Sequence, residues 1–247
     1  MTQWQTGIVR ENIAWSERLH SLQIDTAAIA FTAGQYTRLG LEIEGSLVAR
    51  PYSFVNPPSD PILEFYFSRV SEGPLSSRLL ALNAGDEIQL ATPPSGFLVL
   101  DELPQSRDLW LLATGTAIGP FLSILATAQP WQRFERIVLV YAVRHQLDLS
   151  YRALLDGFAR DHPTQFQWQA MVSRDPQPTD LSGRIPAAIS DGLLEQRFDL
   201  ALSAENSQVM LCGNPAMVKD AMVVLKQRGL EKNLRRSPGQ VTVERYW

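Results

Sequence analysis

Up to residue 100, short stretches of alternating apolar and polar residues are separated by turn residues. Alternation with a period of two is typical of β-strands that bury one face. One helical stretch, Ser76–Leu82, interrupts the series just after Gly73-Pro74. Regular spacing of short strands and turns favours an antiparallel barrel or sandwich. The expected strands are Trp4–Arg10, Leu19–Asp25, Gln35–Ile43, Leu47–Val55, Ile62–Val70 and Glu87–Ala91.

From Arg107 onward, apolar runs alternate with helical patterns. Strands alternating with helices predict parallel βαβ units in an open α/β sheet. We therefore expect two domains, 1–102 and 103–247, joined near Pro104, with no internal repeat or low-complexity segment. The expected strands are Leu109–Ala113, Ile137–Val143, Phe166–Val172 and Val209–Cys212, and the expected helices Ile118–Thr127, Leu149–Arg160 and Ala216–Arg228.

Composition narrows the class of protein. Of 247 residues 45% are apolar and 19% charged, so the chain can bury a sizeable core. A net charge of −4 argues against a general nucleic-acid binder. No apolar run approaches the ~18 residues of a membrane span. The first residues lack the basic and apolar regions of a signal peptide, so we expect a cytoplasmic protein.

Cysteine and histidine usage excludes several kinds of site. Cys212 is the one cysteine, so the chain can form neither an internal disulfide nor a four-cysteine iron–sulfur cluster. The three histidines, His20, His145 and His162, are too scattered to predict a metal site.

The stretch Leu109–Phe121 ends an apolar run with Thr114-Gly115-Thr116, and a helical pattern follows. Unpaired N–H groups at a helix start favour a phosphate group, and glycine lets the backbone approach a ligand closely. Because the full G-x-G-x-x-G fingerprint is absent, a plain strand-to-helix connection explains this stretch equally well. A similar turn, Gly73-Pro74-Leu75-Ser76, opens the earlier helix, with Ser76 or Ser77 as its expected N-cap. Two such turns favour two phosphate-bearing ligands.

Arg50-Pro51-Tyr52-Ser53 presents an arginine, an aromatic ring and a hydroxyl within four residues. Arginine can pair with a phosphate, tyrosine can stack on a planar ring, and serine can bond a heterocycle nitrogen. Strand alternation places Arg50 and Tyr52 on one face and Ser53 on the other. Packing alone is the alternative explanation, with Tyr52 in the core and Arg50 in solvent.

Three arginines of the second half stand at or near expected strand ends: Arg144, Arg174 and Arg184. Carboxyl ends of parallel strands converge on the ligand crevice of an open α/β sheet. An arginine there, in place of a carboxylate, favours NADP over NAD. Any one of them is commonly a solvated surface residue; the set favours anion binding.

Cys212-Gly213-Asn214-Pro215 repeats the strand–turn–helix arrangement near the C-terminus. Cys212 is either a small buried apolar residue or a neighbour of a nicotinamide ring, for which Gly213 would give clearance. The chain ends in Tyr246-Trp247, and terminal aromatics fray unless something docks them.

Together these motifs resemble ferredoxin/flavodoxin–NADP+ reductases, most closely bacterial ones, over essentially the whole chain. The resemblance implies a six-stranded antiparallel FAD-binding barrel followed by an NADP-binding open parallel α/β domain. Three features depart from the family pattern: Gly-Thr-Ala-Ile-Gly-Pro-Phe at Gly115–Phe121, Pro51 in the first motif, and Trp247 beyond the terminal tyrosine.

The resemblance assigns roles residue by residue. Arg50 would meet the FAD pyrophosphate, Tyr52 would stack on the isoalloxazine and Ser53 would approach its N5. Tyr246 would cover the flavin face, and Ser53, Cys212, Glu244 and Tyr246 form the expected catalytic set. The other expected contacts to non-covalent FAD are Pro51, Phe65, Tyr66, Phe67, Gly73, Leu75, Ser76, Thr116 and Trp247. NADP would be held by Thr114, Gly115, Arg144, Ser173, Arg174, Arg184, Cys212, Gly213, Asn214 and Pro215, with Arg174 and Arg184 on the 2′-phosphate.

The expected activity is hydride transfer between NADPH and FAD, coupled to single-electron exchange with ferredoxin or flavodoxin. We expect a monomer. Two alternatives stay open: the reductase component of an oxygenase system, and a non-enzymatic nucleotide-binding regulator.

Overall fold

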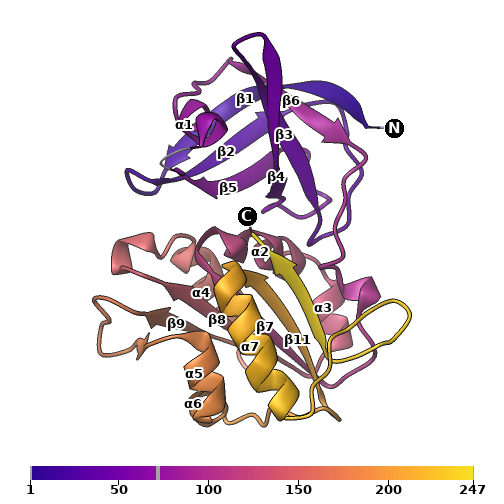
Figure 1. The fold of residues 1–247 in the computed structure, drawn as a ribbon, viewed down its shortest axis with the longest axis vertical. Coiled ribbons are helices and arrows are strands. Elements are labelled where there is room, and N and C mark those ends of the chain that lie inside the picture. Colours follow the sequence, from indigo (N-terminus) through magenta and orange to yellow (C-terminus); the bar gives the residue numbers. More distant parts are fainter. Residues whose placement is uncertain (1, 71–72, 247) are drawn as a thin grey trace. The chain divides into compact units, whose positions relative to one another are not determined.

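The computed structural model describes residues 2–70 and 73–246. The chain forms two compact units (Figure 1). The first contains residues up to Val99 together with Gly119–Thr127, and the second contains Leu100–Ile118 and residues from Ala128 onward. The predicted domain ranges stay a prediction.

Six antiparallel strands build the first unit, which confirms the strand series expected from alternation. Their spatial order is β4-β3-β6-β1-β2-β5. An antiparallel bridge between Phe54 and Phe65 joins the two edges, and the Val55 N–H donates to the Glu64 carbonyl at 2.9 Å. The sheet therefore curls toward a barrel. The strands are β1 Gln3–Ala14, β2 Leu19–Asp25, β3 Tyr36–Ile43, β4 Ser46–Ser53, β5 Leu63–Ser68 and β6 Glu87–Thr92.

The interior of this unit follows the alternation of its strands. Leu22 and Ile24 of β2 and Leu39 of β3 are fully buried, and they share one core cluster with Phe65. Pro51 lies on β4, an edge strand of the sheet order, where a missing N–H costs least.

Helix α1 spans Pro74–Leu80, two residues earlier than predicted at each end. Gly73 is its N-cap and no side chain caps it, so the expected serine cap is wrong. Proline favours the first helical position, because it has no N–H to satisfy there. The Ser76 hydroxyl lies inside the helix and accepts the Val70 N–H at 3.0 Å.

Six parallel strands in the order β10-β9-β8-β7-β11-β12 form the sheet of the second unit. This confirms the predicted open parallel sheet. The strands are β7 Asp108–Thr114, β8 Arg136–Val143, β9 Phe166–Val172, β10 Leu181–Ser182, β11 Ser207–Gly213 and β12 Val241–Arg245.

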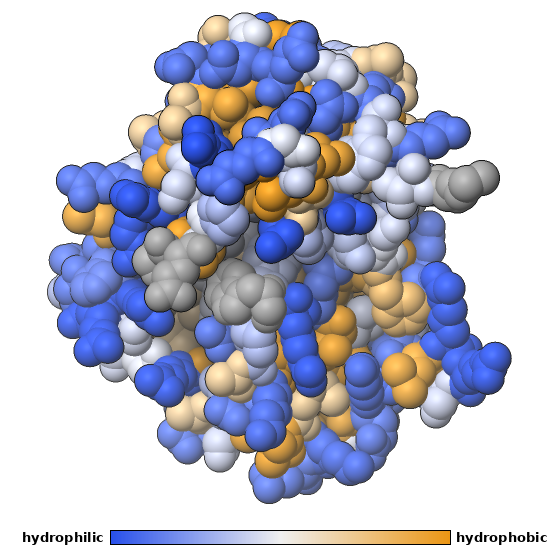
Figure 2. All heavy atoms as spheres, turned by 45° about the horizontal axis from the view of Figure 1, so that its top comes forward, coloured by the Kyte–Doolittle hydropathy of each residue, from blue (hydrophilic) through white to orange (hydrophobic). Residues whose placement is uncertain are grey.

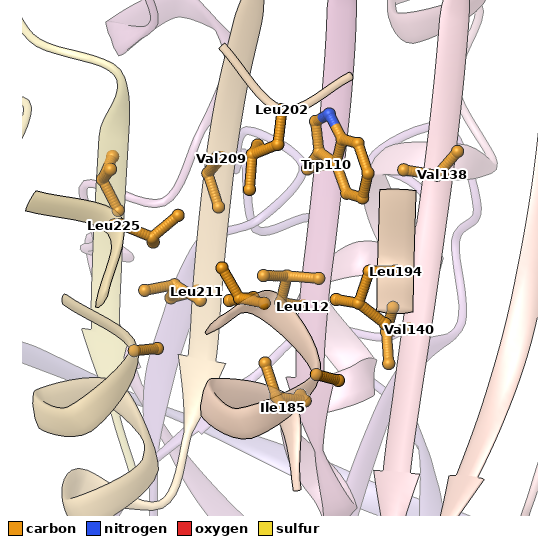
Figure 3. Close-up of a cluster of buried hydrophobic side chains, with 14 of the residues drawn as sticks. Trp110, Leu112, Val138, Val140, Ile185, Leu194, Leu202, Val209, Leu211 and Leu225 are labelled. Carbon is orange, nitrogen blue, oxygen red and sulfur yellow. The ribbon is translucent and has the colours of Figure 1, made fainter. Parts of the chain in front are cut away.

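A continuous apolar core covers one face of this sheet (Figure 3). Trp110 and Leu112 of β7 and Leu211 of β11 are fully buried against Ile185 and Leu194 from the helices. The helices of this unit are α3 Gln129–Arg133, α4 Arg152–Asp161, α5 Ile185–Ser190, α6 Leu193–Phe198 and α7 Pro215–Gln227, while α2 Gly119–Leu125 belongs to the first unit.

Several elements were not predicted, and each is short. The strands β10 and β12 have two and five residues, and α3, α5 and α6 have five or six. Periodicity over so few residues carries little information. The chain end up to Tyr246 does not fray: β12 pairs with β11, and the Tyr246 N–H donates to the Gly213 carbonyl at 3.0 Å.

Hydrophilic residues cover most of the surface in view in Figure 2, and apolar residues form scattered patches between them. Among the described residues, no helix has the length and apolarity needed to cross a membrane. Nor do the described His, Cys, Asp and Glu side chains gather in groups of three or more that could hold a metal ion.

Candidate functional site

The end of β4 presents the Arg50–Ser53 motif as strand alternation predicts. The Arg50 side chain is exposed, the Tyr52 ring is half-buried and Ser53 is buried. Tyr52 meets the edge of the Phe67 ring, with centroids 6.0 Å apart and planes at 79°. Burial raises the pKa of Tyr52 to about 12, against the opposing effect of the Arg50 charge. The phenol is therefore neutral at physiological pH, and the exposed Arg50 guanidinium next to it donates one hydrogen bond, to the Ala49 carbonyl at 2.8 Å.

The aromatic residues of β5 lie on two faces. Phe65 and Phe67 are almost wholly buried in the core cluster of the first unit. Phe67 supports the Tyr52 ring from the interior. Tyr66 is also buried but lies outside that cluster. The Phe65 ring packs on the Phe54 ring, with centroids 5.0 Å apart. The expected contacts of all three aromatic residues with the flavin stay predictions.

The turn before α1 is shaped around Ser76. A Cβ at Gly73 would lie 3.1 Å from both Ser76 Oγ and Val70 Cβ, so glycine fits tightly there. Leu75 and Ser76 are both buried. The Ser76 hydroxyl is occupied by its own loop, and its expected phosphate contact stays a prediction.

In the second unit, β7 ends in the Thr114-Gly115 turn. Gly115 has φ +57, and no atom lies within 4 Å of the place where its Cβ would stand. This left-handed conformation favours glycine, and the free space lets another molecule approach the backbone. The segment continues as a 3₁₀ helix, Gly115–Ile118, in which Thr116 is buried.

Thr114 and Gly213 join the carboxyl ends of β7 and β11. A Cβ at Gly213, whose φ is +141, would lie 2.0 Å from Thr114 Oγ1. That oxygen accepts the Asn214 N–H at 2.9 Å. Glycine is therefore needed at position 213 because the Thr114 hydroxyl fills the space of a Cβ, and the predicted clearance for a nicotinamide ring stays a prediction.

Asn214 and Pro215 begin helix α7. The Asn214 carboxamide oxygen accepts the N–H groups of Ala216 at 2.9 Å and of Met217 at 3.3 Å. Both predicted NADP residues therefore have a local capping role. Whether they also hold a nucleotide stays a prediction.

Cys212, Glu244 and Tyr246 form one cluster, as a shared catalytic role requires. Cys212 is fully buried and stands opposite Glu244 in the β11–β12 register. Burial raises the pKa of the Cys212 thiol well above its ordinary value; the Glu244 charge acts in the same direction, and a hydrogen bond with Tyr246 opposes them. The thiol is therefore neutral at physiological pH. Trp247 lies outside the described residues.

The three predicted phosphate-binding arginines lie at the carboxyl ends of three neighbouring strands. Arg144 directly follows β8, Arg174 lies two residues after β9, and Arg184 lies two residues after β10. The Arg174 N–H donates to the Arg144 carbonyl at 3.0 Å. All three side chains are exposed. Within residues 2–70 and 73–246 none of the three guanidinium groups forms a salt bridge or side-chain hydrogen bond. Ser173, expected to contact NADP, is exposed next to Arg174.

Sequence reasoning missed two parts of this edge of the sheet. One is the hydroxyl of Thr114 as an acceptor for Asn214. The other is Gln146, which follows β8 and bonds both Asp175 and Asp180. Polar residues directly after parallel strands were the available signal, but their partners lie too far along the chain to be paired by spacing.

The geometry fits the expected cofactors. Three unpaired guanidinium groups suit a nucleotide with several phosphates. The open backbone at Gly115 suits a close approach, and the half-buried Tyr52 ring beside Arg50 suits a planar ring linked to a phosphate.

Comparison with known proteins agrees with each unit. Residues 8–98 match the family described as "Oxidoreductase FAD-binding domain", and residues 111–222 match "Oxidoreductase NAD-binding domain". Barrel and sheet thus define a flavin-dependent nicotinamide oxidoreductase.

Relatives narrow this class. The flavodoxin/ferredoxin–NADP reductase of Escherichia coli (strain K12) is 48% identical over 100% of both chains. The ferredoxin–NADP reductase of Pseudomonas aeruginosa is 31% identical over 94% of this chain and 93% of its own. A ferredoxin NADP+ reductase from Neisseria gonorrhoeae, solved with FAD and NADP, has a TM-score of 0.92 and 30% identity over 99% of this chain and 98% of that one. The chain belongs to the flavodoxin/ferredoxin–NADP reductase family.

Proposed function

We propose that this chain exchanges two electrons with NADPH through bound FAD, and single electrons with a ferredoxin or flavodoxin. The observation that carries the NADP assignment is the set of three unpaired arginines behind β8, β9 and β10. A 2′-phosphate, present in NADP and absent from NAD, is the group that arginines at this edge would select. The names of the relatives, flavodoxin/ferredoxin–NADP reductase and ferredoxin–NADP reductase, support the proposed exchange of single electrons with a ferredoxin or flavodoxin.

The proposal keeps the predicted site residues in their predicted roles. Arg50 binds the FAD phosphates, Tyr52 stacks on the flavin and Ser53 bonds its N5. Arg174 and Arg184 hold the 2′-phosphate. Further FAD contacts are Pro51, Phe65, Tyr66, Phe67, Gly73, Leu75, Ser76 and Thr116; further NADP contacts are Thr114, Gly115, Arg144, Ser173, Cys212, Gly213, Asn214 and Pro215.

FAD supplies the hard chemistry, since it takes up two electrons together and releases them singly. The chain's own residues orient the reactants and tune charge. The neutral Cys212 thiol introduces no second negative charge beside Glu244. Tyr246, which is hydrogen-bonded to Cys212, competes with the nicotinamide for the position over the flavin. Tyr246→Ser therefore raises NADP+ affinity.

We also propose that the protein is a monomer and that it is cytoplasmic, since both suit an enzyme that exchanges electrons with a diffusing carrier.

The test of the proposed function is an anaerobic titration of the purified protein with NADPH and then NADH, followed at the visible flavin absorption. Bleaching at a much lower NADPH than NADH concentration supports the proposal. Arg174→Ala and Arg184→Ala should each narrow the preference for NADPH over NADH. Arg236→Ala removes an exposed arginine of the segment between α7 and β12 and serves as the control outside the site. A protein that stays colourless with added FAD refutes the flavoenzyme; selectivity that survives both variants refutes the 2′-phosphate assignment.

A further inference from the structure

The three arginines of the proposed nucleotide site stand on or next to loops, and loops are mobile unless something holds them. Arg144 opens the loop after β8, and Arg174 lies in the loop after β9. Arg184 follows β10, a strand of only two residues. Arranging three such side chains for one nucleotide is costly unless the loops are already ordered.

Gln146 connects these loops through three different groups. Its backbone N–H donates to Asp175 Oδ1 at 3.0 Å, and its side-chain Nε2 donates to Asp180 Oδ2. Its Oε1 accepts from Arg152 at 3.5 Å. With the guanidinium on the oxygen and the carboxylate on the nitrogen, the carboxamide has one favoured orientation.

The two carboxylates held by Gln146 belong to the segments that carry Arg174 and Arg184. Asp175 is the neighbour of Arg174 in sequence, and Asp180 directly precedes β10, which leads to Arg184. Gln146 itself lies two positions after Arg144. One residue thereby ties together the backbone segments that carry all three arginines.

The loop between Arg174 and β10 is folded around the same contacts. Asp180 Oδ2 also accepts the Gln177 N–H at 2.7 Å. The buried Gln169 donates to the Thr179 carbonyl at 2.8 Å, and His145 Nδ1 lies 3.5 Å from Asp175 Oδ2. Both carboxylates thus already have donors from the protein.

We propose that Gln146 is a positioning residue for NADP(H) selectivity: its clamp on Asp175 and Asp180 prearranges Arg174 and Arg184 for the 2′-phosphate, beside Arg144, which contacts the same nucleotide. The inference rests on the function proposed above and assigns a role to a residue that itself carries no charge. The side-chain half of the clamp, from Gln146 to Asp180, is the part that mutation can remove.

Three variants separate geometry from charge. Gln146→Met keeps the side chain's size and the net charge but loses the hydrogen bond to Asp180. The double variant Gln146→Glu/Asp180→Asn keeps the net charge and restores the bond with donor and acceptor exchanged. Gln167→Met makes the same substitution at an exposed glutamine of β9 and is the matched control.

The measurement is dye reduction by the purified holoenzyme, with kcat and KM determined separately for NADPH and NADH. In Gln146→Met the ratio of kcat/KM for NADPH to that for NADH should fall about 3- to 10-fold, which corresponds to one lost hydrogen bond. The fall should arise from KM for NADPH, with kcat unchanged. The double variant should recover most of the ratio, and Gln167→Met should match the wild type.

Three results overturn the inference: an unchanged ratio in Gln146→Met, a double variant as poor as Gln146→Met, or equal losses with both nucleotides. These differ from a failure of the proposed function. If the wild type does not prefer NADPH, or Arg174→Ala keeps the preference, the 2′-phosphate assignment itself is wrong. If Arg174→Ala loses the preference while Gln146→Met keeps it, only the clamp is wrong.

Discussion

Replacing Gly213 with alanine tests the close contact between Gly213 of β11 and Thr114 of β7. The new Cβ would stand 2.0 Å from Thr114 Oγ1 and 3.1 Å from both Thr114 Cβ and Thr114 N. In addition, φ is +141, a conformation that residues with a Cβ rarely adopt. The change therefore combines a steric clash with backbone strain.

The two costs can be sized separately. Holding alanine at such a φ costs about 1–3 kcal/mol. Forcing extra volume into a filled space costs about 1–3 kcal/mol more. We expect Gly213→Ala to lower the free energy of unfolding by about 2–6 kcal/mol. NADPH-dependent reduction should also fall in the folded protein, since Asn214 is held by the same hydroxyl.

The double variant Thr114→Ala/Gly213→Ala isolates the clash. Thr114→Ala alone removes the acceptor for the Asn214 N–H and should cost about 0.5–1.5 kcal/mol. In the double variant Thr114 Oγ1 is gone. The free energy of unfolding should therefore fall by less than the sum of the two single-variant losses, by at least ~1 kcal/mol. Denaturant unfolding of all four proteins, with and without added FAD, gives the coupling. Additive losses, or a Gly213→Ala protein as stable as the wild type, would refute the steric argument.

Three further predictions concern other groups. Cys212, buried and with a raised thiol pKa, should resist alkylation at pH 8 in the native protein and react on unfolding; native reactivity would contradict its burial. For Tyr52, the folded pKa of about 12 exceeds the unfolded value of about 10, so its stabilising contribution is complete below pH 10 and disappears as pH rises from 10 to 12. Tyr52→Phe should lack this alkaline loss in pH-dependent unfolding, and an unchanged pH profile would refute the assignment. Asn12 donates to the Leu79, Leu80 and Leu82 carbonyls at the end of α1, so Asn12→Ala should destabilise the protein by about 1–3 kcal/mol, whereas the exposed Asn83→Ala should cost less. Equal melting temperatures for the two variants would contradict this capping role.

Local pattern determined the order and type of the long elements. The strand Leu19–Asp25 and the strand Phe166–Val172 were predicted with their observed bounds, because alternation or a continuous apolar run reports burial directly. Arg144 and Arg174, behind β8 and β9, could also be placed, since parallel strands align their carboxyl ends without reference to side-chain contacts. The position of Arg184 could not, because β10 has only two residues and was not predicted.

Tertiary structure decided which side chains meet. The sequence suggested that Gly213 clears a ligand, and the folded chain adds a reason that spacing does not show: the Thr114 hydroxyl, about a hundred residues away along the chain, fills the space of a Cβ. It suggested a serine cap for α1, but Ser76 is turned to the Val70 N–H. The bonds from Gln146 to Asp175 and Asp180 exist only because β8 and β9 lie side by side. Periodicity and strand order follow from local burial, but partners in a hydrogen bond depend on distances that the chain acquires only when it folds.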